Sequence, residues 1–471
     1  MICEPGGDLP ELFGLVHGRR IGEGTGVDKD IRADLERIAK AALAAVTPEG
    51  CLRRALRLQG DRLAVAGRTY DLSSVRRLLV VGFGKAAARM AAALEDVLGE
   101  RITAGLVVTA DGYKVPTGRV AVAEAAHPVP DARGLAAAQG IVELVSEAGE
   151  TDLVVVLISG GGSALLTLPA AGITLEDLMR TNELLLRSGA NIQELNTVRK
   201  HLSRVKGGQL ARLAAPAQVL SLILSDVPGD PLDAIASGPT APDPTSFQDA
   251  ARILRRYGLW DKVPPGVRAH IEAGVRGEIN ETPKPGDPVF ELVQNVIVGS
   301  GRTAAEAAAR EGARLGYRTL ILTTTLEGEA REVAKVLAAL ARELVCFRRP
   351  LPPPTLVIAA GETTVTVRGN GSGGRNQELA LAAAPGIQGL AGVALMSLGT
   401  DGRDGPTDAA GGLVDGDTIT RLKAAGVGLE EALAKNDSYH ALKASEDLIV
   451  TGPTGTNVAD LVLLGVRKEA G

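Results

Sequence analysis

The stretch LLVVGFGKAAARMAAALEDV, residues 78–97, decides the fold class of this chain. It passes from four apolar residues through the glycine-rich turn Gly82-Phe83-Gly84-Lys85 into an alanine-rich segment. A short, uninterrupted apolar run predicts a strand that is buried on both faces, and the alanine-rich segment after it predicts a helix. We therefore expect one βα unit here.

The same succession of apolar run, glycine-rich turn and helical segment returns at residues 153–163 and 296–315. Further apolar runs that we expect to form buried, parallel strands lie at residues 105–109, 219–224, 319–324, 356–360 and 393–398. Strands that alternate with helices along the chain are typical of proteins with a largely parallel sheet. The sequence thus predicts the α/β fold class.

The length and the proline clusters predict two domains. A chain of 471 residues is long enough for two or three domains, each with its own core. Residues 263–288 are rich in proline, glycine and charge, which indicates a connector. We expect a flexible extension at residues 1–28, one domain at 29–280 and a second at 285–471. A second proline cluster, at 350–354, is either an inner loop or the start of a smaller unit.

The composition excludes several kinds of partner. The formal net charge is −5 and the basic residues are scattered, so nothing draws nucleic acid by bulk electrostatics. No apolar stretch reaches the roughly 18 residues that a membrane-spanning helix needs. The three cysteines form no CxxC spacing, which fits a reducing compartment. We expect a cytoplasmic protein that binds small molecules, and the sequence leaves open whether it forms a homo-oligomer.

The turn Gly82-Phe83-Gly84-Lys85 combines a cation with the geometry of an anion site. Glycines between a strand and a helix let backbone N–H groups approach an anion closely, and the helix start adds a partial positive charge. Lys85 would stand at that helix start, where a lysine opposes the helix dipole unless an anion is bound. The alternative is an exposed lysine beside a tight turn.

Two known motifs fit this turn poorly. The P-loop GxxxxGK[ST] fails because alanine follows the lysine and no glycine stands at the earlier position. The dinucleotide fingerprint GxGxx[GA] is met by Gly82, Gly84 and Ala87, but the acidic partner comes late, at Asp111. The turn is therefore neither a P-loop nor a convincing dinucleotide site.

The segment Ser159-Gly160-Gly161-Gly162-Ser163 is a second candidate for binding a cofactor or substrate anion. Three successive glycines remove every Cβ atom from a turn that follows an apolar run, and Ser163 is a natural N-cap for the next helix. Backbone N–H groups exposed in this way fit a phosphate or a carboxylate. The alternative is that another segment of the chain crosses the turn closely.

The stretch LNTVRKHLSRVKGG, residues 195–208, predicts a helix that ends at a glycine cap. Asn196, Arg199 and Lys200 share one face by the i, i+3, i+4 rule, so an amide and two cations can clamp an anion there. Lys206 belongs to the same basic stretch and is a further candidate ligand of that anion. The alternative is a solvated basic helix face.

Acidic residues after two apolar runs predict metal ligands. Asp226 follows the run 219–224, and Asp401 follows the run 393–398. In open α/β sheets, ligands collect at the carboxyl ends of strands, and Mg²⁺ prefers one or two carboxylates together with phosphate oxygens and water. We expect Asp226 and Asp401 to hold a divalent metal ion. The alternative for Asp226 is a hydrogen bond within its proline-glycine turn.

Arg375 ends the glycine-rich stretch GNGSGGR and starts a predicted helix. The planar fork of its guanidinium suits a phosphate or a carboxylate. An arginine at a helix start opposes the helix dipole. A bound anion therefore explains the position of Arg375 better than helix stability does.

Together these motifs resemble the MOFRL-containing glycerate kinases over about residues 31–466. The segments that carry the resemblance, in the order that the family shows, are GFGKAAARM, HPVPD, LISGGGSALL, LNTVRKHLSRVKGG, SDVPGD, IASGPTAPDPT, GGRNQELALA, GTDGRDGPTDAAGG, NDSY and GPTGTNVADL. One departure is Pro231, which stands where the family usually has a second aspartate, so a metal role is excluded at that position.

The resemblance implies a large Rossmann-like, three-layer N-terminal domain and a C-terminal α/β domain with the active-site cleft between them. The C-terminal domain would contain the MOFRL region, about residues 350–466. The resemblance also implies ATP and a divalent metal such as Mg²⁺ as cofactors, D-glycerate as the substrate and 2-phosphoglycerate as the product. Lys85 and Arg375 stand at the positions of the lysine and the arginine that are the family's proposed catalytic residues.

Two other functions stay open at the level of sequence. An NAD(P)H-dependent hydroxypyruvate reductase would use the GxGxx[GA] match and a similar small hydroxy acid. A non-catalytic sensor of nucleotides or sugar phosphates would bind ATP without turnover.

Overall fold

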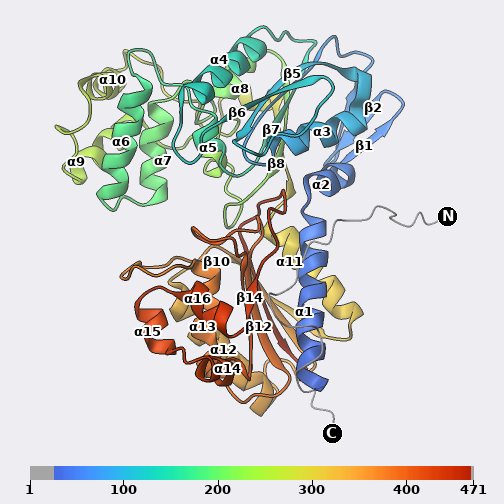
Figure 1. Ribbon diagram of the computed structural model, residues 1–471. Coiled ribbons are helices and arrows are strands. Elements are labelled where there is room, and N and C mark those ends of the chain that lie inside the picture. The colour runs from blue at the N-terminus through green and yellow to red at the C-terminus, as the bar shows by residue number, and fades with distance from the viewer. Residues whose placement is uncertain (1–25, 468–471) are drawn as a thin grey trace. The chain divides into compact units, whose positions relative to one another are not determined.

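The computed structural model describes residues 26–467, which form two compact units (Figure 1). The first unit consists of residues 48–299. The second unit consists, among the described residues, of 26–47 together with 300–467. No helix between residues 26 and 467 combines the length and the apolar character that a membrane crossing needs.

The first unit is built on a parallel sheet of six strands. In space their order is β6 (Val120–Ala125), β5 (Ile102–Ala110), β4 (Leu78–Phe83), β7 (Leu153–Ile158), β8 (Gln218–Leu224) and β9 (Val293–Gly299). Numbered along the chain this is 3-2-1-4-5-6, the order of doubly wound dinucleotide-binding folds. The order reverses between β4 and β7, and ligands of such folds bind outside the carboxyl ends of the strands at that switch point.

Helices cover both faces of this sheet. β4 and β7 are buried at every residue, as their apolar runs predicted. α4 (Ala132–Ser146) and α8 (Gln209–Ala214) share one core cluster with alternate residues of these strands. α3 (Ala87–Leu98) contributes no residue to that cluster and contacts β4, β5 and β7, so it covers the opposite face. The predicted three-layer α/β fold is confirmed.

Smaller elements complete the first unit. α2 (Pro48–Ala55) leads into an antiparallel sheet of β1 (Leu56–Gln59), β2 (Arg62–Val65) and β3 (Arg68–Asp71). A group of helices with its own core consists of α6 (Leu175–Arg187), α7 (Ile192–His201), α9 (Phe247–Arg256) and α10 (Pro265–Val275) (Figure 1). Short helices are α5 (Gly162–Leu165), η1 (Gly99–Arg101), η2 (Ile235–Ser237) and η3 (Pro288–Leu292).

The second unit contains a mixed sheet. Its strands follow the order β10 (Arg318–Leu326), β11 (Thr355–Gly361), β15 (Asp460–Val466), β12 (Val393–Gly399), β13 (Gly411–Asp415) and β14 (Leu448–Ile449). β10 and β11 are parallel, but β15 lies between β11 and β12 and is antiparallel to both. The prediction of a parallel strand at residues 393–398 is therefore wrong in direction, because an apolar run reports burial on both faces and not strand direction.

Helices flank the second sheet as well. They are α1 (Gly26–Ala45), α11 (Gly301–Arg314), α12 (Ala330–Phe347), α13 (Arg375–Ile387), α14 (Thr418–Ala424), α15 (Leu429–Ala434) and α16 (Ser438–Ala444). α12 and α13 share a core cluster with the strands, whereas α1 packs against α11, β12 and β15. The second unit therefore takes its first helix from the start of the described chain.

The predicted boundary between residues 280 and 285 does not match this division. β9 completes the first unit's sheet, so the chain leaves that unit only after residue 299. The proline-rich segment packs inside the first unit: Pro265 starts α10, a position that suits proline, and buried Thr282 Oγ1 donates to Asp243 at 2.9 Å. The cluster at 350–354 is a loop between α12 and β11. Of the predicted extension, residues 1–25 lie outside the described residues, and 26–28 begin α1.

Gly84 offers a test of how closely the strand ends pack. Its φ is +123°, and an added Cβ atom would overlap Ser159. We predict that Gly84→Ala lowers the free energy of unfolding by about 2 kcal/mol or more, because backbone strain and overlap add together. Gly112→Ala is the matched control, since its φ is +81° but the space around it is open; about 1 kcal/mol is expected there. Equal losses in urea unfolding would contradict the close approach at Gly84.

Candidate functional site

Two glycine-rich turns meet at the switch point, and hydrogen bonds lock one to the other. The N–H group of Lys85 donates to the carbonyl oxygen of Gly160 at 2.9 Å. The N–H group of Ala86 donates to Ser159 Oγ at 3.0 Å. The N–H group of Gly84 is also occupied, by a carbonyl oxygen of β5. All three N–H groups therefore serve the fold, and they are not available to cradle an anion as the sequence predicted.

The side chains of Lys85 and His127 lie against Gly161. A Cβ atom on Gly161 would stand 2.9 Å from His127 Nε2 and 3.5 Å from Lys85 Cγ, so glycine is required for this contact. Burial lowers the pKa of His127, and the positive charge of Lys85 lowers it further. No role for His127 was predicted from the sequence, because no spacing links it to Lys85. Its position just after β6 is the signal that could have indicated one.

Three N–H groups of the 159–163 turn have no hydrogen-bond partner in the described part of the chain. They belong to Gly160, Gly161 and Ser163, whereas the N–H group of Gly162 donates to the carbonyl oxygen of Ser159 at 3.2 Å. Unpaired N–H groups in a glycine turn suit phosphate or carboxylate oxygens. Anion binding at this turn stays a prediction. Its N–H groups are available for an anion, whereas those of the turn after β4 are already bonded within the protein.

Helix α7 presents Asn196 and Arg199 beside that turn. Ser237 Oγ donates to Asn196 Oδ1 at 3.1 Å and lies 2.8 Å from Ser163 Oγ, so one chain of polar contacts links α7 to the turn. Arg199 Nε donates to Asn182 Oδ1 at 2.8 Å. Burial lowers the pKa of Arg199 to about 10, and no carboxylate among the described side chains, residues 31–467, pairs with it. A half-buried guanidinium without a carboxylate partner is suited to bind an anion from outside the protein.

Lys206 has a structural position in this cluster. Its ammonium donates to the carbonyl oxygens of Ser163 and Leu166 at 2.7 and 2.8 Å, and the side chain is buried. Burial lowers the pKa of Lys206 to about 7, and the positive charge of Arg199 contributes to this shift. Lys206 therefore supports the turn through the carbonyl oxygens of Ser163 and Leu166, and below about pH 7 it adds positive charge near Arg199.

Lys200 does not join Asn196 and Arg199 as the sequence predicted. Its ammonium lies 3.2 Å from Asp233 and 3.5 Å from Asp243, and the side chain is 3% exposed. Two carboxylates already compensate this buried charge. Lys200 therefore anchors α7 through carboxylates of the protein, and only Asn196 and Arg199 of the predicted set are left to bind an anion.

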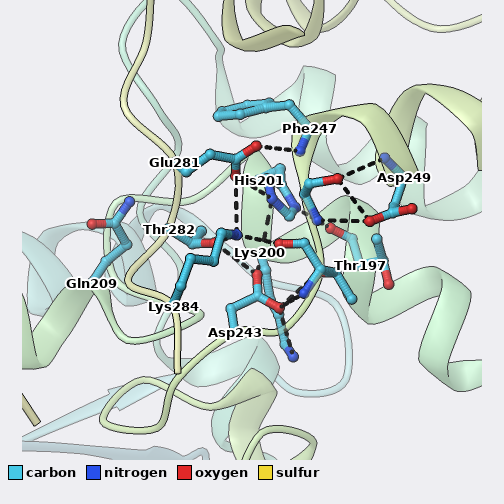
Figure 2. A network of polar contacts seen from close by, with 12 residues as sticks. Thr197, Lys200, His201, Gln209, Asp243, Phe247, Asp249, Glu281, Thr282 and Lys284 are labelled. Carbon is cyan, nitrogen blue, oxygen red and sulfur yellow. Dashed lines mark hydrogen bonds and ion pairs between the residues drawn. The ribbon is translucent and has the colours of Figure 1, made fainter. Parts of the chain in front are cut away.

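A buried polar network continues this anchor at the end of α7 (Figure 2). His201 Nδ1 lies 2.8 Å from the carbonyl oxygen of Thr197, and Nε2 lies 3.2 Å from Glu281. Burial pushes the pKa of Glu281 upward, but hydrogen bonds from His201, the Phe247 N–H group and Lys284 outweigh it and lower the pKa to about 2. The network fixes the helix that presents Arg199.

Arg375, in the second unit, is already paired with protein carboxylates. Its Nε and Nη2 donate to the two oxygens of Asp460 at 2.6 and 3.0 Å, and Nη1 lies 2.9 Å from Glu362. Burial alone would lower the pKa of Arg375, but these carboxylates raise it. Asp460 occupies the guanidinium fork, so it explains the position of Arg375 at the helix start without the bound anion that the sequence predicted.

The start of α13 is capped by Asp404 and not by a ligand. The N–H groups of Asn376 and Gln377 donate to its carboxylate oxygens at 3.1 and 2.8 Å. Burial raises the pKa of Asp404 to about 6. The structural roles of Asp404 and Asp460 were not predicted from the sequence. The only signal was the glycine-rich loops around these residues, which indicate that backbone segments pack closely there.

The two predicted metal ligands stand in different units. Asp226 follows β8 in the first unit, and Asp401 follows β12 in the second. Asp401 Oδ1 accepts a hydrogen bond from the Arg403 N–H group at 3.0 Å. Within residues 26–467, no group of three or more His, Cys, Asp or Glu side chains is arranged to hold a metal ion. A metal at either residue would need most of its ligands from a nucleotide and water.

Lys206 makes the stability of the protein depend on pH. Its pKa is about 7 in the fold and 10.5 as the ordinary value, so between these pH values only the unfolded state holds the proton. The free energy of unfolding then rises with pH, by up to about 1.4 kcal/mol per pH unit from this residue. We predict that Lys206→Met loses this slope between pH 7 and 10 in urea unfolding, whereas Lys114→Met, at an exposed lysine, keeps it. The same slope in Lys206→Met and wild type would contradict the assignment.

Comparison with known proteins agrees with this architecture. Residues 34–272 match the Domain of unknown function (DUF4147), and residues 355–460 match the MOFRL family. The chain is 45% identical to the Glycerate 2-kinase of Pyrococcus horikoshii, over 94% of this chain and 99% of that protein. It is 46% identical to the D-glycerate 2-kinase of Thermotoga maritima, over 84% and 92%.

Two further matches bear on function. A protein of Agrobacterium vitis that carries hydroxypyruvate reductase in its name is 43% identical, over 93% of this chain and 95% of that protein. The solved structure of the Thermotoga maritima glycerate kinase matches with a TM-score of 0.83 at 42% identity, over 93% of this chain and 100% of that chain. Near-complete coverage at this identity leads to one conclusion: the chain belongs to the MOFRL-containing glycerate kinases.

Proposed function

We propose that this protein transfers the terminal phosphoryl group of ATP to the 2-hydroxyl of D-glycerate, which gives 2-phosphoglycerate and ADP. The observation that carries the proposal is the cluster at the switch point, where Arg199 has no carboxylate partner beside a turn with unpaired N–H groups. Both features suit anions, and the substrates of this reaction are a carboxylate and a polyphosphate. The names of the relatives support the choice of D-glycerate.

The site offers a different type of donor to each anion. The guanidinium of Arg199 is a planar fork that matches a carboxylate, so it would hold D-glycerate, with Asn196 beside it. The N–H groups of Gly160, Gly161 and Ser163 form a concave set that suits phosphate oxygens. Lys85 lies against Gly161, so its ammonium would reach the phosphoryl group that is transferred.

Phosphoryl transfer asks a protein mainly for positioning and for compensation of the charge that spreads over the transferred group. Lys85 would compensate that charge. His127 has a lowered pKa and is therefore neutral near pH 7, so its imidazole could accept the proton of the 2-hydroxyl. The side chains of Lys85 and His127 stand together at the same glycine.

Two parts of the proposal lie outside this cluster. Arg375 stays a proposed catalytic residue, with its guanidinium held in one orientation by Asp460. Asp226, in the first unit, and Asp401, in the second, each stay a proposed ligand for Mg²⁺ that would arrive with ATP. When bound, such an ion compensates the negative charge of the phosphate oxygens.

A hydroxypyruvate reductase is a poorer fit to the turn after β4. A dinucleotide-binding turn must direct N–H groups at the pyrophosphate. Here the N–H groups of Gly84, Lys85 and Ala86 are bonded to carbonyl or hydroxyl oxygens of the protein. The strand order suits a dinucleotide, but the turn that would bind it is occupied.

Phosphorus NMR of a mixture of protein, ATP, Mg²⁺ and D-glycerate tests the proposed reaction. The expected result is ADP and 2-phosphoglycerate in equal amounts. The appearance of 3-phosphoglycerate would correct the position of transfer, and ATP binding without turnover would favour a sensor. Oxidation of NADH with hydroxypyruvate, without phosphoryl transfer, would overturn the proposal in favour of a reductase.

Lys85 is the residue on which turnover should depend most. We predict that Lys85→Ala lowers kcat by about a hundredfold or more, because one charge that compensates the transition state is lost. The fold should persist, since the hydrogen bonds that lock this turn come from the backbone of Lys85 and not from its side chain. Lys114→Ala, at an exposed lysine, is the matched control. A kcat within a few-fold of wild type would remove Lys85 from the mechanism.

A further inference from the structure

The segment Ala236-Ser237-Gly238 turns in the left-handed direction beside the candidate site. Its three φ angles are 50°, 62° and 62°, and two of the three residues are not glycine. An L-residue is unfavourable in this region, because its Cβ atom crowds the next carbonyl oxygen. Such a conformation persists only where the surrounding structure enforces it, and such positions concentrate at functional sites.

The surrounding structure does enforce this turn. The Gly207 N–H group donates to the carbonyl oxygen of Ser237 at 2.9 Å, and the Gly208 N–H group donates to that of Gly238 at 2.7 Å. A Cβ atom on Gly238 would stand 2.9 Å from Asp233 Cα. The turn is thus clamped between the end of the basic stretch and the loop after β8.

The strained backbone places one hydroxyl group at a junction. Ser237 is fully buried, and its Oγ donates to Asn196 Oδ1 at 3.1 Å and lies 2.8 Å from Ser163 Oγ. Since Oδ1 of Asn196 is engaged in this way, its amide Nδ2 is turned away from Ser237 and can donate to a ligand. The same contact fixes Ser163, whose N–H group is unpaired in the described chain.

We propose that Ser237 is a positioning residue for D-glycerate: it orients Asn196 beside the carboxylate that Arg199 binds, and it holds Ser163 in the adjacent turn that is proposed to bind phosphate. This inference rests on the proposed function. Ser237 itself does not touch the substrate, and it acts through the two side chains that it joins. With this φ angle, the Ser237 hydroxyl lies between Asn196 of α7 and Ser163 of the glycine-rich turn.

Three variants separate the hydroxyl from the strain. Ser237→Ala removes the hydroxyl and keeps the unfavourable φ angle, whereas Ser237→Gly removes both. Ala66→Gly is the matched control, because Ala66 has φ 45° in the hairpin between β2 and β3 and its change relieves the same kind of strain elsewhere. Each variant is measured by steady-state kinetics with D-glycerate, by calorimetric binding of D-glycerate, and by thermal unfolding.

The expected result is a KM for D-glycerate raised about tenfold in both Ser237 variants, with kcat within about threefold of wild type. A hydroxyl that only stabilised the fold would change the melting temperature and leave the ratio of KM to kcat unaltered. The melting temperature of Ser237→Gly should be higher than that of Ser237→Ala, because the glycine relieves the strain. The melting temperature of Ala66→Gly should be higher than that of wild type, with an unchanged KM for D-glycerate.

A KM and an affinity within twofold of wild type in Ser237→Ala would overturn the role of Ser237 and leave the proposed function intact. A raised KM in Ala66→Gly would also overturn it, because relief of strain alone would then explain the effect. Wild-type protein that neither binds nor phosphorylates D-glycerate would overturn the proposed function, and this inference with it.

Discussion

The hydrogen bonds between the turn after β4 and the turn after β7 are the constraint on which the candidate site depends. The N–H groups of Lys85 and Ala86 reach Gly160 and Ser159, and Gly84 lacks the side chain that would keep the turns apart. The N–H groups of the first turn are used within the protein, whereas those of Gly160, Gly161 and Ser163 in the second turn are unpaired in the described chain. One turn is therefore structural, and the other is suited to an anion.

The two arginines that the sequence singles out show how context decides the role of a cation. Arg375 is held by Asp460 and Glu362, so protein carboxylates compensate its charge. Arg199 is half-buried against Asn182 and no carboxylate of the described chain pairs with it. A partly desolvated cation without a carboxylate partner gains more from binding an anion than one whose charge is already compensated. The electrostatic requirement for a ligand is therefore stronger at Arg199.

Much of this arrangement was accessible from sequence. The apolar runs predicted the buried strands β4, β7, β11 and β12, and the glycines between strands and helices predicted the turns at the switch point, because both signals are local. The run 319–324 was also predicted to be buried, but β10 is partly exposed, because it lies at the edge of its sheet. Three features could not be predicted, since each depends on contacts between distant parts of the chain. They are the direction of β12, the assembly of the second unit from two separate segments of the chain, and the pairing of Arg375 with Asp460. Lys200 and Lys206 belong to a basic stretch that looks uniform in sequence, and only the fold assigns them to carboxylates and to carbonyl oxygens.

Binding of the D-glycerate carboxylate by Arg199, at the switch point of the first unit, is the part of the proposed function that can be measured without turnover. Calorimetric titration of D-glycerate into wild type, Arg199→Met and Lys114→Met, without ATP, tests it most directly. Methionine keeps the apolar length of the side chain and removes its charge. We expect the affinity for D-glycerate to fall at least tenfold in Arg199→Met and to stay unchanged in Lys114→Met. Equal affinity in Arg199→Met and wild type would contradict it.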